Sequence, residues 1–131
     1  MLHLQPFRRL IHFKKPIEAI GERCGVPQLF SQIALALANE RAFLFADGDS
    51  FCVLRPKVEN DERIVEAWVA YSQHGSAIRT HLPQAKQMAR EIGASCIQFW
   101  TVLPVLNQFA RRLGFERHRT ERAFTIWRIP L

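Results

Sequence analysis

The sequence predicts a mixed α/β fold, one β-sheet with helices on both faces, and two observations support it. Some segments alternate apolar and polar residues as strands do, whereas others repeat apolar residues at helical spacing. Their order is β-α-α-β-β-β-α-β-α-β-β, with glycine, proline and Asp/Asn-rich turns between them. This order excludes a helical bundle and an all-β sandwich. The length of 131 residues suits one domain spanning 1–131.

The first third of the chain predicts one strand and two helices. Residues 8–13 are expected to form the strand. Pro16 suits the first turn of a helix, which Gly25 ends, and Pro27 opens a second helix. The apolar faces of these helices are Ile17, Ile20 and Cys24 in the first, and Leu29, Phe30, Ile33, Ala34 and Leu37 in the second.

Three strands connected by tight turns follow. Residues 41–46 and 51–58 flank the turn at 47–50, and Pro56 weakens the far end of the second strand. Residues 63–71 are apolar on both faces, so this strand is expected at the centre of the sheet.

The last third alternates helix and strand. After the turn at 72–77, a helix ends at Gly93, strand 94–102 follows, and a second helix ends at Gly114 before a hairpin. Strands 63–71 and 94–102 should be parallel, joined by a crossover. The buried faces are expected to be Leu82, Ala85, Ala89 and Ile92 in the first helix, and Leu106, Phe109, Ala110 and Leu113 in the second; the hairpin strands are 115–119 and 123–129.

Composition narrows the function classes. The formal charge of +6 favours anionic partners such as a phosphorylated cofactor or nucleic acid. The three cysteines are widely spaced and the five histidines form no ligand-spaced pair, so we expect neither a disulfide framework nor a metal site. No apolar run has the roughly 20 residues of a membrane span, and the N-terminus lacks a secretory signal. These features predict a cytoplasmic protein.

Three features resemble the GNAT (GCN5-related) N-acetyltransferase superfamily, and one of them is the helix and strand that follow the turn at 72–77. Strand 64–71 runs into Ser-Gln-His-Gly-Ser-Ala at 72–77, which is similar to the family's Q/R-x-x-G-x-G/A turn. Residues 109–115, Phe-Ala-Arg-Arg-Leu-Gly-Phe, look like the family's closing helix end and strand. The resemblance covers essentially the whole chain. It implies the acyl-CoA N-acyltransferase fold.

The resemblance also implies a coenzyme A site. Glycine allows a ligand to approach the main chain, and a helix N-terminus attracts a pyrophosphate. The pantetheine arm would lie between two splayed strands, at 69–71 and 99–101. The implied cofactor-binding residues are Val69, Ala70, Tyr71, Gln73, His74, Gly75, Ser76, Ala77 and Thr101.

Three positions depart from the family pattern. Ser72 stands at the Q/R position of the turn, with a glutamine one residue later. Pro83 either lies inside the following helix or marks a helix that starts near Thr80. Ala110 occupies the place where many GNAT enzymes have a tyrosine that protonates the leaving thiolate.

Two residues are candidates for catalysis. Glu66 matches the family's strand glutamate, which acts as the base, and an equally strong alternative is an ion pair with an arginine on a neighbouring strand. Tyr71, the only tyrosine, is either a substitute acid or a packing residue at a strand end. The oxyanion donor would be a main-chain amide near Val69.

The tryptophans and the basic residues each allow two interpretations. Trp68, Trp100 and Trp127 either line an acceptor pocket or pack in the sheet. The basic residues form either a nucleic-acid patch or solvated faces. They are Arg8, Arg9, Lys14, Lys15, Arg111, Arg112, Arg117, Arg119 and Arg122.

Three functional hypotheses follow. The first is an acetyl-CoA-dependent N-acetyltransferase acting on an unidentified small-molecule or protein amine. The second is a GNAT-like binding or structural module without catalysis, similar to degenerate bacteriophage proteins and located in a host cytoplasm or virion. The third is a basic nucleic-acid-binding domain. The acceptor and the oligomeric state do not follow from the sequence.

Overall fold

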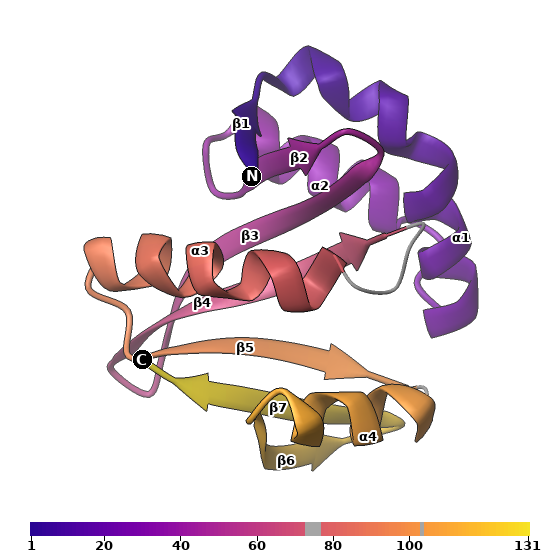
Figure 1. Cartoon of the computed structure of the whole chain (residues 1–131). Coiled ribbons are helices and arrows are strands. Elements are labelled where there is room, and N and C mark those ends of the chain that lie inside the picture. The colour runs from indigo at the N-terminus through magenta and orange to yellow at the C-terminus, as the bar shows by residue number, and fades with distance from the viewer. Residues whose placement is uncertain (73–76, 103) are drawn as a thin grey trace.

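The computed structural model describes residues 1–72, 77–102 and 104–131, and a mixed sheet organises them (Figure 1). The sheet has seven strands in the order β1-β2-β3-β4-β5-β7-β6. Among the strands of the described residues, only the β4–β5 pair is parallel, so the expected crossover pair is found, and β4 is central as predicted. The strands are β1 (His3–Gln5), β2 (Phe43–Asp47), β3 (Ser50–Glu59), β4 (Glu62–Tyr71), β5 (Cys96–Thr101), β6 (Glu116–Glu121) and β7 (Phe124–Pro130).

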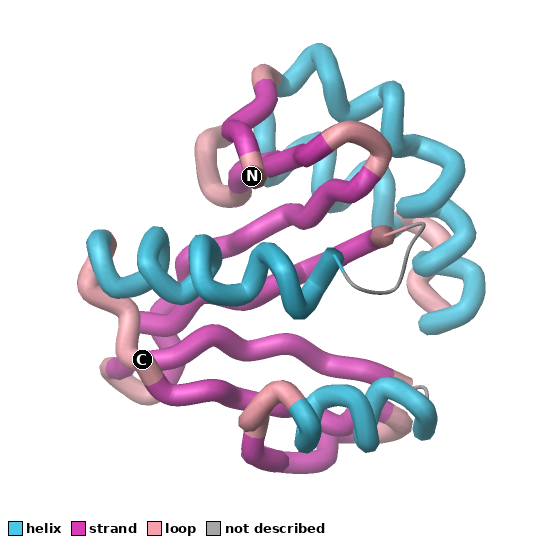
Figure 2. The backbone as a smooth tube through the Cα atoms, viewed as in Figure 1, coloured by secondary structure: helices cyan, strands magenta, loops and turns pink. Residues whose placement is uncertain are grey.

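Helices cover both faces of the sheet, which confirms the predicted mixed architecture (Figure 2). One face carries the 3-10 helix η1 (Phe7–Phe13), α1 (Lys14–Cys24) and α2 (Leu29–Ala38). The other carries α3 (Ala77–Glu91) and α4 (Pro104–Arg112). Among the described residues, no helix is both long and apolar enough to cross a membrane.

The expected strand at residues 8–13 is wrong, because this segment is the 3-10 helix η1. Its buried residues are Leu10 and Phe13, which lie one turn apart at the three-residue period of this helix type. The first strand is instead β1, which pairs with β2. Pro6 separates the two elements, since a residue without an N–H cannot extend a ladder.

The expectations for α3 and β3 have mixed outcomes. Helix α3 begins at Ala77 and keeps Pro83 inside it, which confirms the first of the two alternatives; the start near Thr80 is not found. The strand β3 continues through Pro56 to Glu59. Ile92 lies beyond the end of α3 and is half-exposed, so its expected place on the buried stripe is wrong.

Two apolar cores lie on opposite faces of the sheet. The first joins η1, α1 and α2 to β2, β3 and the end of β4, with Ile17 and Ile33 fully buried. The second joins α3 and α4 to β5 and β7 around Trp127 and Ala110. Because α1 and α2 cover the β2–β3 side, the first core ends at β4.

A β-bulge at Trp68 changes which face β4 presents. Val53 pairs with Val69 and Leu54 with Ala67, so Trp68 is an additional residue in β4. Ala67 packs in the core of α3 and α4, whereas both Trp68 and Val69 pack in the core of α1 and α2. A regular strand would place neighbouring residues on opposite faces, so the bulge bends β4 just before its end.

Candidate functional site

The parallel ladder between β4 and β5 is short and leaves the ends of both strands apart. It contains the three pairs Ile64–Cys96, Val65–Ile97 and Glu66–Gln98. Beyond Gln98, β5 pairs only with β7, and beyond Glu66, β4 pairs only with β3. The predicted opening between residues 69–71 and 99–101 is therefore present.

Four of the nine predicted cofactor residues lie at the strand ends that flank this opening. Val69, Ala70 and Tyr71 end β4, and Thr101 ends β5 with little exposed surface. Ala77 opens α3. The other four, Gln73, His74, Gly75 and Ser76, lie outside the described residues.

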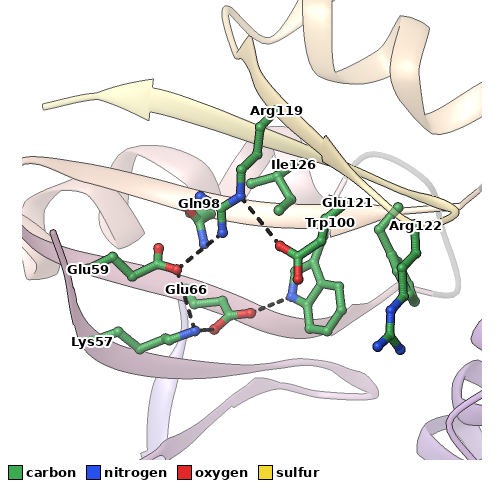
Figure 3. Close-up of a pocket in the computed structure, with 10 residues that line it drawn as sticks. Lys57, Glu59, Glu66, Gln98, Trp100, Arg119, Glu121, Arg122 and Ile126 are labelled. Carbon is green, nitrogen blue, oxygen red and sulfur yellow. Dashed lines mark hydrogen bonds and ion pairs between the residues drawn. The ribbon is translucent and has the colours of Figure 1, made fainter.

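A pocket of about 410 Å³ lies beside the opening (Figure 3). Its lining comes entirely from β3 to β7 and the β6–β7 turn, on the sheet face opposite α3 and α4. Trp100, Phe124 and Ile126 provide its apolar part. The remaining lining residues are polar or charged: Lys57, Glu59, Glu66, Gln98, Arg119, Glu121 and Arg122.

Glu66 lies at the base of this pocket with both carboxylate oxygens bonded. Arg55 donates to Oε2 from Nε at 3.2 Å and from Nη2 at 2.8 Å, and Lys57 Nζ lies 3.2 Å from the same oxygen. The indole nitrogen of Trp100 donates to Oε1 (Figure 3). Glu66 is 1% exposed. The ion pair with an arginine on the neighbouring strand, one of the two predictions for this residue, is confirmed.

Arg55 is itself fixed by an aromatic ring. Its guanidinium lies 3.7 Å from the ring centroid of Trp68, within the range of a cation–π contact. Since Trp68 is the bulged residue, the irregularity in β4 places its ring against the cation that holds Glu66.

A second group of ion pairs continues across the sheet from Glu59. Its carboxylate lies 3.9 Å from Lys57, 3.4 Å from Arg119 and 3.2 Å from Arg128. Burial raises the pKa of Glu59, but the charges of Lys57 and Arg119 and the hydrogen bonds of Gln98 and Arg119 outweigh it. The pKa therefore lies below its ordinary value, and Glu59 is a carboxylate at neutral pH.

The charges that line the pocket balance one another. Arg119 also pairs with Glu121, and Arg128 pairs with Glu62 at 2.8 Å. The pocket therefore presents neutralised polar groups and an aromatic wall rather than a surface of one charge. Arg122, in the β6–β7 turn, makes no ion pair with the other described residues and points away from the paired groups (Figure 3).

Tyr71 packs in the core of α1 and α2. Its ring stacks on Phe51 at 5.7 Å between centroids, and the residue is half-buried. This contact agrees with the packing interpretation of Tyr71. Its role as an acid stays a prediction.

Ala110 is fully buried on the face of α4 that packs against the sheet. This is the position at which the family resemblance led us to look for a tyrosine. Trp127 and Phe115 belong to the same core, and Trp127 is 1% exposed. Trp127 is thus a core residue, Trp68 packs against the other core, and Trp100 lines the pocket. That this pocket takes an acceptor stays a prediction.

Sequence reasoning missed Arg55 and Lys57. A signal for them was present, because residues 55, 57 and 59 alternate along β3 and so share one face of the strand. An alternating charged stripe beside a strand that contains a glutamate predicts cross-strand ion pairs. Pro56, which lies between Arg55 and Lys57, was interpreted only as weakening the end of the strand.

The basic residues do not form one patch. Arg8, Arg9 and Lys14 lie on η1 and the start of α1, near the β1 edge of the sheet, whereas Arg111 and Arg117 lie on α4 and β6 at the opposite edge (Figure 1). Among the described residues, no group of histidine, cysteine and carboxylate side chains is arranged to hold a metal ion.

Comparison with known proteins identifies the fold. No protein-family model and no curated protein matches the chain. Solved structures do match over almost the full length. A GNAT-family acetyltransferase from Listeria monocytogenes is 12% identical, with a TM-score of 0.71, over 100% of this chain and 94% of that one.

Two further matches extend this result. A putative GNAT-family acetyltransferase from Desulfovibrio desulfuricans is 15% identical, with a TM-score of 0.73, over 99% of this chain and 98% of that one. The PaiA N-acetyltransferase from Thermoplasma acidophilum, solved in complex with coenzyme A, is 13% identical, with a TM-score of 0.64, over 100% and 99%. At these identities the likeness concerns the fold.

Proposed function

We propose that this chain, which has the GNAT fold, is an acyl-CoA-dependent N-acyltransferase that transfers an acetyl group to an amine. The observation that carries the proposal is the opening between β4 and β5. A parallel pair that ends after three residue pairs exposes main-chain groups of both strands to a ligand. A fold alone does not determine a function. The opening between β4 and β5 is a local feature that supports this particular activity.

The residues around the opening fit an extended, amide-containing ligand. Main-chain groups at 69–71 and 99–101 flank the opening, and the N-terminus of α3 at Ala77 follows β4 in the chain. A helix N-terminus favours an anion such as a pyrophosphate. When bound there, acetyl-CoA would supply the acyl group as an activated thioester. This chain would hold it mainly with main-chain atoms.

The amine would approach from the pocket on the other side of the opening. The pocket is large enough for a small acceptor, and its polar part carries both charge signs. A bulge beside the opening frees main-chain groups of β4 near Val69 from the regular ladder. An amide there would be the donor for the oxyanion.

Glu66 would act in this reaction through its neighbours. Its two oxygens already accept bonds from Arg55, Lys57 and Trp100, and the carboxylate is buried. A base must come within hydrogen-bond distance of the proton it removes, directly or through one water. We therefore propose a positioning role for Glu66.

Calorimetric titration with acetyl-CoA tests the cofactor. We expect saturable binding at micromolar to millimolar ligand, which protects the protein against thermal unfolding. A chain with no heat and no thermal shift at millimolar acetyl-CoA would lack the cofactor site and hence the activity. A thiol-release assay with a panel of primary amines then tests transfer.

Ala110 favours a second candidate, a GNAT-fold module that binds a ligand or partner without catalysis. The alanine is buried among core residues, so the side chain offers no acid to a leaving thiolate. The same two experiments separate the candidates. Binding of acetyl-CoA without thiol release, across the amine panel, would favour the module over the enzyme.

A further inference from the structure

The indole of Trp100 reaches from β5 to β4 just beyond the point at which the two strands separate. The last ladder pair is Glu66 with Gln98, and Trp100 lies on the same face as Gln98 because residues two apart in a strand share a face. The indole nitrogen nevertheless donates to Glu66, on the other strand (Figure 3). The ring therefore spans the gap on the pocket side.

Glu66 is a fixed anchor for this ring. One carboxylate oxygen is held by Arg55 and Lys57 at 2.8 and 3.2 Å, which leaves the other for Trp100. Arg55 is held in turn against Trp68. With the carboxylate 1% exposed, water competes little for these bonds.

The opposite side of the indole is also supported. Phe124 on β7 contacts Trp100 with 4.6 Å between ring centroids, in an edge-to-face arrangement. Trp100 is still 37% exposed, and it lines the pocket. The ring is thus held by Glu66 and by Phe124, and its remaining surface forms a wall of the pocket next to the opening.

We propose that Trp100 narrows the pocket side of the opening, where it leaves room for the amine but limits the length of the acyl group that this protein accepts. Glu66 is the positioning residue for that wall. This inference rests on the proposed function, which places a thioester in the opening and the amine in the pocket. An acyl chain longer than acetyl would extend from the opening toward the ring, so it would have to displace an indole that is hydrogen-bonded to Glu66 and packed against Phe124.

Binding of a thioester series by calorimetry tests the inference without turnover. The ligands are coenzyme A, acetyl-CoA and butyryl-CoA, and the proteins are wild type, Trp100→Ala and the control Phe43→Ala. Phe43 has the same 37% exposure but lies on β2, outside the pocket. Wild type and Phe43→Ala should bind acetyl-CoA at least as tightly as butyryl-CoA.

Trp100→Ala should reverse this preference to about fifteenfold in favour of butyryl-CoA. The size follows from the two methylenes that butyryl has beyond acetyl, at about fourfold for each one buried, the equivalent of about 0.8 kcal/mol. An unchanged preference in Trp100→Ala, with coenzyme A still bound, would overturn the inference and leave the proposed function standing. Failure of wild type to bind even coenzyme A would overturn both.

Two substitutions of Glu66 test its positioning role. Glu66→Gln keeps an oxygen that accepts the indole N–H, so it should retain the wild-type preference. Glu66→Leu removes the acceptor and should bind the series as Trp100→Ala does. A Glu66→Leu protein that folds, by its circular dichroism, yet keeps the wild-type preference would refute the anchoring. If that variant does not fold, a Trp100→Ala-like preference in Glu66→Gln refutes it instead.

Discussion

Asn107 on α4 accepts a hydrogen bond from the indole nitrogen of Trp127 on β7, at 3.0 Å. Trp127 is 1% exposed, and Arg111, one helical turn later, lies 5.6 Å from its ring centroid. Asn107 is half-buried on α4. The side chain satisfies a donor that no water reaches, and so connects α4 to the sheet.

Replacing Asn107 by Leu should destabilise the fold by about 1–3 kcal/mol, because the buried indole N–H loses its acceptor. Urea denaturation measures the free energy of unfolding. Gln108→Leu is the matched control, since Gln108 is the next residue in the helix and is exposed. Equal effects of the two substitutions would show that the hydrogen bond contributes nothing.

Removing the charge of Arg55 should destabilise the protein through Glu66. Breaking a buried ion pair costs about 3–5 kcal/mol. Here Lys57 remains as a partner and the Arg55 side chain is 24% exposed, so we expect about 1–3 kcal/mol for Arg55→Met. The exposed pair of His12 with Asp49 gives a control, because Asp49→Asn should change stability by less than about 0.5 kcal/mol.

A double-mutant cycle assigns this cost to the pair. The free energy of unfolding is measured for Arg55→Met, Glu66→Gln and the double variant. Residues in direct contact couple by about 0.5–3 kcal/mol. Additive effects within error would mean that Arg55 stabilises the fold through Trp68 alone.

Stability should fall at acidic pH because of Glu59. Lys57 and Arg119 help to hold its pKa below 4.5 in the fold, despite the opposing effect of burial. The unfolded chain therefore binds the proton first, and stability decreases as the pH falls. The contribution of Glu59 is fully present above pH 4.5 and disappears as the pH passes through the folded pKa.

Denaturation at a series of pH values measures this effect. Glu59→Gln should be less stable than wild type at neutral pH and should lose less stability below pH 4.5. Glu18→Gln, on the exposed side of α1, serves as the control and should follow the wild-type curve. If stability falls with pH in Glu59→Gln as steeply as in wild type, the lowered pKa of Glu59 is not the cause of the acid destabilisation.

The sequence predicted the order of most elements because local patterns determine them. Period-2 and period-3.6 apolar spacing, with glycine at helix ends, is visible along the chain itself. The strand predicted at residues 8–13 was wrong because a 3-10 helix buries residues three apart. Over only six residues, this spacing cannot be distinguished from the alternation of a strand. The strand opening at 69–71 and 99–101 came from the family resemblance rather than from periodicity.

The site was less predictable because it depends on pairing between distant segments. The bulge at Trp68 is a property of the register between β3 and β4, and no residue in β4 marks it. The bond between Trp100 and Glu66 requires the same two strands to part after Gln98. Glu66 itself could be found, since a lone carboxylate in an apolar strand needs a partner or a function.

Gly21, inside α1, should be destabilised by alanine, although glycine-to-alanine changes in helices commonly stabilise by about 0.4–1 kcal/mol. After α1 the chain folds back over this residue, and Val26 N–H donates to the Gly21 carbonyl at 2.7 Å. A Cβ on Gly21 would lie 2.6 Å from the carbonyl oxygen of Val26 and 3.1 Å from Cβ of Leu29. The Val26 oxygen is a main-chain atom and the Leu29 Cβ is bonded to the main chain. Removing the clash with a Cβ on Gly21 therefore requires the start of α2 to move.

We expect Gly21→Ala to lower the free energy of unfolding by about 1–3 kcal/mol, as for overpacked cores. Ala19→Gly, at an exposed position of the same helix, measures the intrinsic preference for alanine there and should cost about 1 kcal/mol. If Gly21 were unhindered, Gly21→Ala would gain about what Ala19→Gly loses. A stabilised Gly21→Ala protein would therefore mean that α1 and α2 do not approach as closely as the structure places them.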